Sequence, residues 1–236
     1  TGHYAMLKEN KAGLTLNMPK DKTKDQTYFL YMLNQKIMEN LMFPLENIDK
    51  DQVKNIAKDF DLSIYEKKES MGICFIGKRD FSSFIKKYID TKPGKICDED
   101  GYMLGEHAGL FNYTIGQRKG IKIGGQKNYS EKPWFVLKKD VDKNVVIISQ
   151  DHDRLFSTGK VGLENINWIQ GCPALEKVLK ARFRHGGKLI PVTIMQSDNK
   201  YYLNLSERER AITPGQSAVL YDEEECVGGA IMSYVC

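Results

Sequence analysis

The first part of the chain, up to about residue 70, spaces its apolar side chains mainly as helices do, after a short extended start. A dense run of aromatic and aliphatic residues extends from Asp25 to Gln35, and Pro44 ends this pattern. A second helix is predicted after Asp49, where Gln52 completes a capping box. The apolar residues that follow fall on one helical face, which predicts a helix facing the core: Val53, Ile56, Ala57 and Phe60.

Between residues 71 and 158 the apolar runs are shorter and glycines separate them. Asp100-Gly101 is a strong turn signal between two extended runs, which predicts a hairpin. A second hairpin is predicted where the apolar runs 134–137 and 145–148 flank a polar stretch. One more amphipathic helix is expected after Asp80, from the spacing of Phe81, Phe84, Ile85 and Tyr88.

From residue 159 to the end the pattern favours β-strands. Gly-Gly, Ser-Asp-Asn and Pro-Gly separate the expected strands, which are 178–183, 189–195, 201–205, 218–221 and 227–232. Short strands at this spacing predict a small barrel or sandwich. The sequence therefore predicts an α+β protein in three parts, which are residues 1–70, 71–158 and 159–236.

Composition narrows the possible functions only slightly. The chain has 236 residues, of which 41% are hydrophobic and 28% charged, as in an ordinary globular protein. Its formal charge is +4, so any binding of nucleic acid must come from a local patch of cations. The sequence contains neither an apolar run of membrane-spanning length nor the features of a signal peptide at its start. We therefore expect a cytoplasmic protein without membrane contacts.

Cysteine chemistry centres on one residue. The five cysteines (Cys74, Cys97, Cys172, Cys226 and Cys236) contain no CxxC pair, which argues against a disulfide framework and a zinc site. Cys74 lies in an apolar run between Gly72 and Gly77, where glycines let another molecule approach the backbone. Cations flank this run and favour the thiolate: Lys67, Lys68, Lys78 and Arg79. From the sequence, Cys74 could be either a reactive thiol or a buried structural cysteine, and both interpretations remain open.

Two basic segments are candidates for binding phosphate or RNA. Residues 113–120 and the following Gly124-Gly125 form a glycine-dense loop with two cations, although its spacing is not that of a P-loop. In the β region, Arg182, Arg184 and His185 lie along one predicted strand and its end. The two arginines would share a strand face near the aromatic Phe183. A structural turn and a solvated strand face are the respective alternatives.

The four histidines (His3, His107, His152 and His185) are scattered without metal-binding spacing, so no metal site is predicted from them. Cys74 with His107 as its base would instead make a cysteine hydrolase or acyltransferase, which requires the two side chains within hydrogen-bond reach.

Six segments together resemble the bacterial tRNA-specific 2-thiouridylases, which are tRNA-uridine 2-sulfurtransferases. They occur in the order of that family along the whole chain. The segments are Thr1-Gly2-His3-Tyr4-Ala5, the Lys24-Asp25-Gln26 run through Leu30, Gly72 to Gly77 around Cys74, Gly105-Glu106-His107, Thr114 to Gly120, and Thr213-Pro214-Gly215-Gln216-Ser217-Ala218.

The resemblance implies a fold for each of the three parts. Residues 1–70 would be the C-terminal, helical remainder of an α/β PP-loop nucleotide-binding domain, of the adenine nucleotide alpha hydrolase-like type. Residues 71–158 would be a small mixed central domain that carries the sulfur on Cys74. Residues 159–236 would be an antiparallel β-barrel that binds tRNA.

The resemblance also implies the chemistry. The family transfers sulfur to C2 of the wobble uridine of tRNA and depends on ATP and Mg²⁺. Cys74 would be the catalytic cysteine and would receive its sulfur, as a persulfide, from a cysteine desulfurase or a sulfur-relay protein. A disulfide between Cys74 and a second catalytic cysteine would follow the transfer.

Position by position, the resemblance assigns further site residues. Gly2 matches a residue beside ATP, and His3 matches one near the bound tRNA. The other predicted tRNA contacts are Lys24, Asp25 and Gln26, Arg182 and Phe183 on the barrel, and Gln216 in the Thr-Pro-Gly-Gln turn.

One departure from the family pattern is large. The SGGxDSS loop that holds pyrophosphate in the family does not occur in these residues, and the first catalytic cysteine is also missing. We therefore expect the natural protein to extend upstream, and the 236 residues of this chain to be inactive by themselves. A non-catalytic RNA-binding module, in which Cys74 is only packed, is the remaining alternative.

Overall fold

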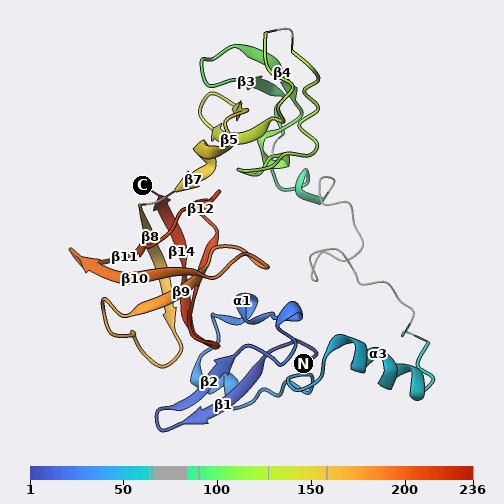
Figure 1. Cartoon of the computed structure of the whole chain (residues 1–236), viewed down its shortest axis with the longest axis vertical. Helices are drawn as coiled ribbons and strands as arrows, with labels where there is room; N and C mark the ends of the chain where they lie inside the picture. Colours follow the sequence, from blue (N-terminus) through green and yellow to red (C-terminus); the bar gives the residue numbers. More distant parts are fainter. Residues whose placement is uncertain (64, 66–83, 90, 127, 158, 236) are drawn as a thin grey trace. The chain divides into compact units, whose positions relative to one another are not determined.

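The structure is a computed structural model that describes residues 1–63, 65, 84–89, 91–126, 128–157 and 159–235 (Figure 1). The chain forms two compact units. Thr1–Lys67 and Thr158–Cys236 together make the first, the barrel unit, and Lys68–Ser157 make the second, the central unit. Two segments far apart in the sequence therefore share one unit, and the division into three domains stays a prediction.

Six antiparallel strands close into the barrel that the sequence predicted, so the α+β class with a C-terminal β-barrel is confirmed. In spatial order, each strand pairs with the next and the last pairs with the first. The strands are β8 (Lys160–Trp168), β14 (Glu225–Val235), β13 (Ser217–Asp222), β9 (Val178–Arg182), β10 (Ile190–Ser197) and β11 (Lys200–Leu205). The pattern missed β8, whose second half alternates apolar with strongly polar side chains.

Strand β13 is buried on both faces, which explains how the N-terminal segment joins the barrel. Ala218 and Leu220 point into the barrel core, whereas Val219 and Tyr221 belong to a second apolar cluster outside it. Neighbouring side chains of a strand point to opposite faces, so the outer face needs its own cover. The N-terminal segment supplies it with residues such as Leu16 and Met38.

The N-terminal segment is less helical than its pattern predicted. It opens with a hairpin of β1 (Met6–Asn10) and β2 (Gly13–Asn17), and β2 pairs with β14 to extend the barrel sheet. Only short helices follow: η1 (Lys22–Lys24), α1 (Thr27–Leu30) and α2 (Gln35–Met38). The side chain of Asn167 donates to the carbonyl oxygens of Tyr31 and Leu33, which a longer helix would have used itself.

Helix α3 (Lys50–Asp59) begins where the sequence predicted, with a complete capping box between Asp49 and Gln52. Its apolar face, however, is not core. The exposed fractions of Ile56 and Phe60 are 45% and 74%, and no residue of the helix is buried. The expectation was wrong because periodicity shows that a helix has an apolar face and does not show what covers it.

The central unit holds a four-stranded sheet in the order β4-β3-β6-β5. Both predicted hairpins are confirmed, as β3 (Gly94–Cys97) with β4 (Met103–His107) and β5 (Phe135–Asp140) with β6 (Val145–Ser149). Parallel pairing of β3 with β6 joins them around a small apolar core. Most of the helix expected after Asp80 lies outside the described residues.

Among the described residues, no helix is both long and apolar enough to cross a membrane.

Candidate nucleic-acid interface

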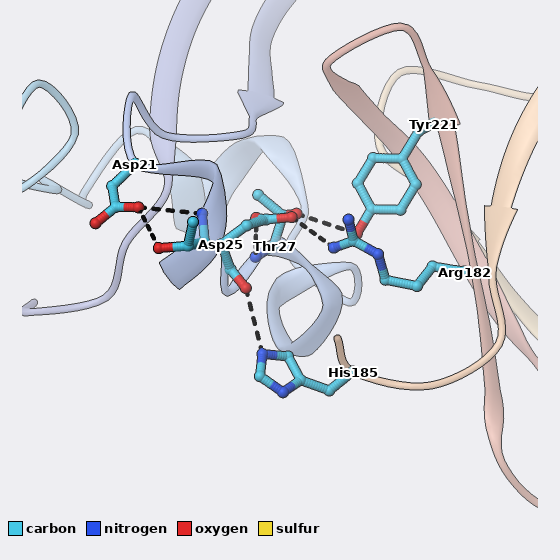
Figure 2. A network of polar contacts seen from close by, with 7 residues as sticks. Asp21, Asp25, Thr27, Arg182, His185 and Tyr221 are labelled. Carbon is cyan, nitrogen blue, oxygen red and sulfur yellow. Dashed lines mark hydrogen bonds and ion pairs between the residues drawn. The ribbon is translucent and has the colours of Figure 1, made fainter. Parts of the chain in front are cut away.

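An ion pair in the interior of the barrel unit joins two of the predicted site residues. The Nη1 atom of Arg182, at the end of β9, lies 2.6 Å from Oδ2 of Asp25 (Figure 2). The side chains are only 12% and 2% exposed, respectively. A buried charge requires a partner, so this pair holds the segment after η1 against the barrel wall.

Thr27 and Tyr221 complete the surroundings of the Asp25 carboxylate. The other carboxylate oxygen accepts hydrogen bonds from the Thr27 hydroxyl at 2.7 Å and from the Thr27 backbone N–H at 3.0 Å. The Thr27 hydroxyl also lies 3.1 Å from the Tyr221 hydroxyl, and the Arg182 guanidinium lies over the Tyr221 ring at 5.2 Å. Burial raises the pKa of Tyr221 well above its usual value, so its hydroxyl stays protonated at neutral pH.

The start of the chain is tied to the same place. The side-chain oxygen of Gln26 accepts from the Tyr4 backbone N–H at 2.9 Å, and the Gln26 N–H donates to the Tyr4 carbonyl at 3.0 Å. His3, directly before Tyr4, is therefore kept near Gln26. On the other side of Asp25, the His185 Nε2 atom lies 3.3 Å from the Asp25 carbonyl oxygen.

Asp21 organises the short helix that carries Lys24. Its carboxylate accepts from the Thr23 hydroxyl at 2.6 Å and from the Thr23 and Lys50 backbone N–H groups, each at 3.1 Å. The hydrogen bond from Thr23 is the main reason why the pKa of Asp21 is lowered. This residue thus caps η1 and also holds the start of α3 in place.

The turn that contains Gln216 contacts the same N-terminal segment. Tyr28 donates to the Ser217 carbonyl oxygen at 3.0 Å, and the hydroxyls of Tyr31 and Ser217 lie 3.1 Å apart. Burial is the main cause that raises the pKa of Tyr28 to about 12, so this donor keeps its proton at neutral pH. Gly215 has a φ of +85°, which glycine adopts without strain.

The predicted site residues of the barrel unit therefore come from chain segments that contact one another, but they differ in exposure. Gly2 is exposed, and His3, Lys24, Gln26 and Gln216 are half-buried. Asp25 and Phe183 are each 4% exposed, and Phe183 belongs to the barrel core. Sequence reasoning named Arg182 and Arg184 as one strand face, yet only Arg184 is exposed.

Two further residues of this network, Thr27 and Tyr221, were not recognised as functional candidates in the sequence. Their hydroxyls surround the Asp25–Arg182 pair, and His185, a candidate from the sequence, contacts the Asp25 backbone carbonyl. The ring of His185 also packs on the exposed ring of Phe29, with centroids 4.5 Å apart. Thr27 carried a signal, since a hydroxyl two positions after an aspartate is typical of a local turn. Tyr221 carried none, because it looks like any strand residue.

Comparisons with known proteins cover nearly the whole chain. Sequence models match residues 1–78 as a tRNA methyl transferase HUP domain, 82–150 as a tRNA methyl transferase PRC-barrel domain, and 158–232 as an aminomethyltransferase beta-barrel domain. A tRNA-specific 2-thiouridylase MnmA of Hahella chejuensis is 40% identical over 240 residues, covering 100% of this chain. One of Francisella tularensis is 42% identical over 238 residues, covering 98%.

The chain belongs to the tRNA-specific 2-thiouridylase family. It spans 65% of the length of the Hahella relative and 66% of the Francisella relative. The resemblance that six short segments indicated therefore extends over all of the chain's own residues.

In this 2-thiouridylase-family chain, His107 is unsuited to be the base of a cysteine hydrolase. It is 3% exposed, and its Nδ1 atom accepts from the Gly109 N–H at 3.0 Å. The other ring nitrogen, Nε2, then carries the proton and donates to the Asn144 carbonyl oxygen at 3.2 Å. Both nitrogens are thus used within the central unit, which is a structural arrangement.

Three of the five cysteines of this chain lie within the described residues, and none of these three forms a disulfide. Cys97 and Cys226 are buried, and Cys172 is exposed. Burial raises the pKa of the Cys226 thiol to about 12, which removes it as a nucleophile at neutral pH. Cys74 lies outside the described residues, and its role stays a prediction. In the described part of the chain, no group of histidine, cysteine and acidic side chains is arranged to hold a metal ion.

Proposed function

We propose that the natural protein containing this chain is an ATP-dependent tRNA-uridine 2-sulfurtransferase, which places sulfur on C2 of the wobble uridine of tRNA. The observation that carries the proposal is the 40% identity to a tRNA-specific 2-thiouridylase over the full length of the chain. The contacts between the segments around Lys24, Arg182 and Gln216 support it, because they gather separate motifs in one unit.

Within this proposal, exposure separates contacting residues from positioning residues. His3, Lys24, Gln26 and Gln216 retain accessible surface and would touch the tRNA. Asp25, Arg182 and Phe183 are largely buried, so they would act by holding these neighbours in place. The buried pair fixes the backbone on both sides of Asp25, and such support is what a binding surface requires.

The nucleotide would be held only in part by this chain. Gly2 is the one predicted ATP contact, and the space around its Cα is open, which fits a backbone that approaches a ligand closely. When bound, ATP with Mg²⁺ would activate the C2 oxygen of the uridine as a leaving group. The phosphate-holding loop does not occur in these residues, so we expect them alone to bind tRNA without thiolating it.

Cys74 would carry the sulfur. A cysteine desulfurase or a sulfur-relay protein would load it as a persulfide, whose terminal sulfur attacks C2 while the activated oxygen departs. A second cysteine thiolate would then attack the Cys74 sulfur, which breaks the S–S bond to the transferred atom and forms a disulfide between the two cysteines. The new sulfur remains on the uridine.

Formation of 2-thiouridine in tRNA tests this proposal. In the natural protein, Cys74→Ala should abolish thiolation and leave tRNA affinity unchanged, because the thiol carries sulfur and does not hold the RNA. Cys172→Ala is the matched control, since Cys172 is an exposed thiol outside the proposed chemistry. Full thiolation by the Cys74 variant, or loss of it in the Cys172 variant, would contradict the assigned role.

A further inference from the structure

A hollow of about 320 Å³ in the central unit lies outside the interface described above. Its walls include Arg118, Lys122 and Lys132, against a single acid, Glu131. All three cations are exposed, and they form no ion pair within the described part of the chain. Trp134 also lines the hollow and packs on Tyr129, with ring centroids 5.0 Å apart. The hollow is therefore open, positively charged and bounded by a fixed aromatic side chain.

Two of the glycines that line this hollow, Gly124 and Gly125, have no structural need to be glycine, whereas Gly120 has a φ of +81°. Gly124 and Gly125 have no positive φ, and a Cβ atom at either position would meet no atom within 4 Å. The fold would accept a side chain at both. A glycine that neither the backbone nor the packing requires indicates a place where another molecule comes close to the main chain.

At Lys122 the situation is reversed, because the backbone conformation favours glycine but the residue has a long side chain. Its φ is +59°, in the left-handed region where glycine is relaxed and a long side chain is strained. The residue before it, Ile121, is buried in the core, so the backbone at this point is fixed. A lysine thus occupies a position that favours glycine, a few residues from glycines at positions that tolerate side chains. Strained backbone of this kind is found at functional sites, and at Lys122 it accompanies a cation that lines the hollow.

The walls are also held in place before any ligand arrives. The Gly116 N–H donates to the Val136 carbonyl at 2.8 Å, and the Val136 N–H donates to the Gln117 carbonyl at 3.0 Å, so the loop is tied to β5. On the other side, Gln150 donates to the carbonyl oxygens of Ser130 and Lys132. A rigid loop that exposes cations and bare backbone matches a phosphate ligand.

We propose that this hollow, the phosphate groove lined by Arg118, Lys122, Gly124, Gly125 and Lys132, binds the sugar–phosphate backbone of the tRNA. The inference rests on the proposed function and adds a second RNA contact, in a unit to which none of the tRNA-contact residues assigned above belongs. Three exposed cations against one acid fit a polyanion, and the open glycine backbone fits a ribose–phosphate chain that passes closely over it.

Two variants test the groove without harming the fold. Lys122→Gly removes a cation and relieves the strained backbone, and Gly124→Ala adds only a methyl group in open space. Both should keep or slightly raise the Tm of the whole chain.

Binding of a transcribed tRNA is measured by filter binding at about 0.1 M salt. Lys122→Gly should weaken the affinity about fivefold and lower the slope of its salt dependence by about 1. Gly124→Ala should weaken affinity without changing the slope. Lys138→Ala, an exposed cation of β5 outside the groove, is the control and should change affinity less than about twofold.

The outcomes separate this inference from the function on which it rests. If the unchanged chain binds tRNA but both groove variants bind it as the control does, the groove is not an RNA contact. A fall in Tm for Gly124→Ala would overturn the argument from unneeded glycines. If the unchanged chain binds no tRNA at all, the proposed function fails together with the groove.

Discussion

In the barrel unit, Asp25 and Arg182 bind each other away from solvent although 157 residues separate them in the sequence. In the central unit, the cations of the phosphate groove remain exposed beside bare glycine backbone. In the sequence, the segments around Arg182 and Arg118 looked alike, as basic candidates for binding phosphate or RNA. A cation paired with the carboxylate of a distant segment, as Arg182 is with Asp25, holds its surroundings in place, whereas the exposed cations of the groove are left to bind a ligand.

The largest effect is expected from Arg182→Ala, which leaves the buried Asp25 carboxylate without its cation. Removal of one partner of a buried pair should lower the free energy of unfolding of the barrel unit by about 3 kcal/mol. Urea unfolding followed by circular dichroism measures this. Arg184→Ala is the matched control, because Arg184 is exposed and its ion pair with Glu209, at 3.5 Å, is accessible to solvent on the arginine side, so its loss should cost at most about 1 kcal/mol. Equal effects of the two variants would remove the distinction between the arginines.

A smaller loss is expected in the central unit from His107→Ala. The variant leaves the buried Gly109 N–H and the Asn144 carbonyl without their partner, which should cost about 2 kcal/mol of unfolding free energy. If the natural protein with this substitution stays folded at low temperature, it should still thiolate tRNA. Abolished thiolation in a folded variant would return His107 to a catalytic role.

Tyr221→Phe removes one hydroxyl and keeps the ring beneath Arg182. Loss of the hydrogen bond with Thr27 should lower the free energy of unfolding by about 1 kcal/mol. Tyr234→Phe is a suitable control, since Tyr234 is 42% exposed and should show no measurable change. Thermal unfolding of the two variants side by side decides whether the network extends to Tyr221.

The smallest expected effect is the difference in unfolding free energy between alanine variants of two glycines in the same loop. Gly120 has a φ of +81°, so Gly120→Ala should cost about 1 kcal/mol, whereas Gly124→Ala should cost nothing. The comparison is made by chemical unfolding of the two single variants. A similar loss at both positions would show that Gly124 is also structural.

The barrel and both hairpins of the central unit were predictable from the sequence, because strand period and turn residues are local signals. The docking of the N-terminal segment was not. It depends on the outer face of β13 and on Asn167, which binds the carbonyl oxygens of Tyr31 and Leu33 from more than a hundred residues away. Local propensity predicts a longer helix around Tyr31, and the hydrogen bonds from Asn167 to the backbone end it.

The candidate site was predictable in its residues and not in their roles. Motif resemblance pointed to Asp25, Arg182 and Phe183 as tRNA contacts, whereas burial and pairing set them apart from the accessible Lys24 and Gln26. A sequence shows which residue types occur in a motif. Whether a charge faces solvent depends on a partner that only the fold brings close.

Sulfur loading of the natural protein is the most direct test of whether Cys74 carries the sulfur. The natural protein would be incubated with a cysteine desulfurase and cysteine, and its peptides mapped by mass spectrometry. We predict one added sulfur on the Cys74 peptide, removed by reductant, and none on the peptides of the exposed Cys172 or the buried Cys226. Sulfur on Cys172 alone, or on no cysteine, would contradict the assignment of Cys74 as the sulfur carrier.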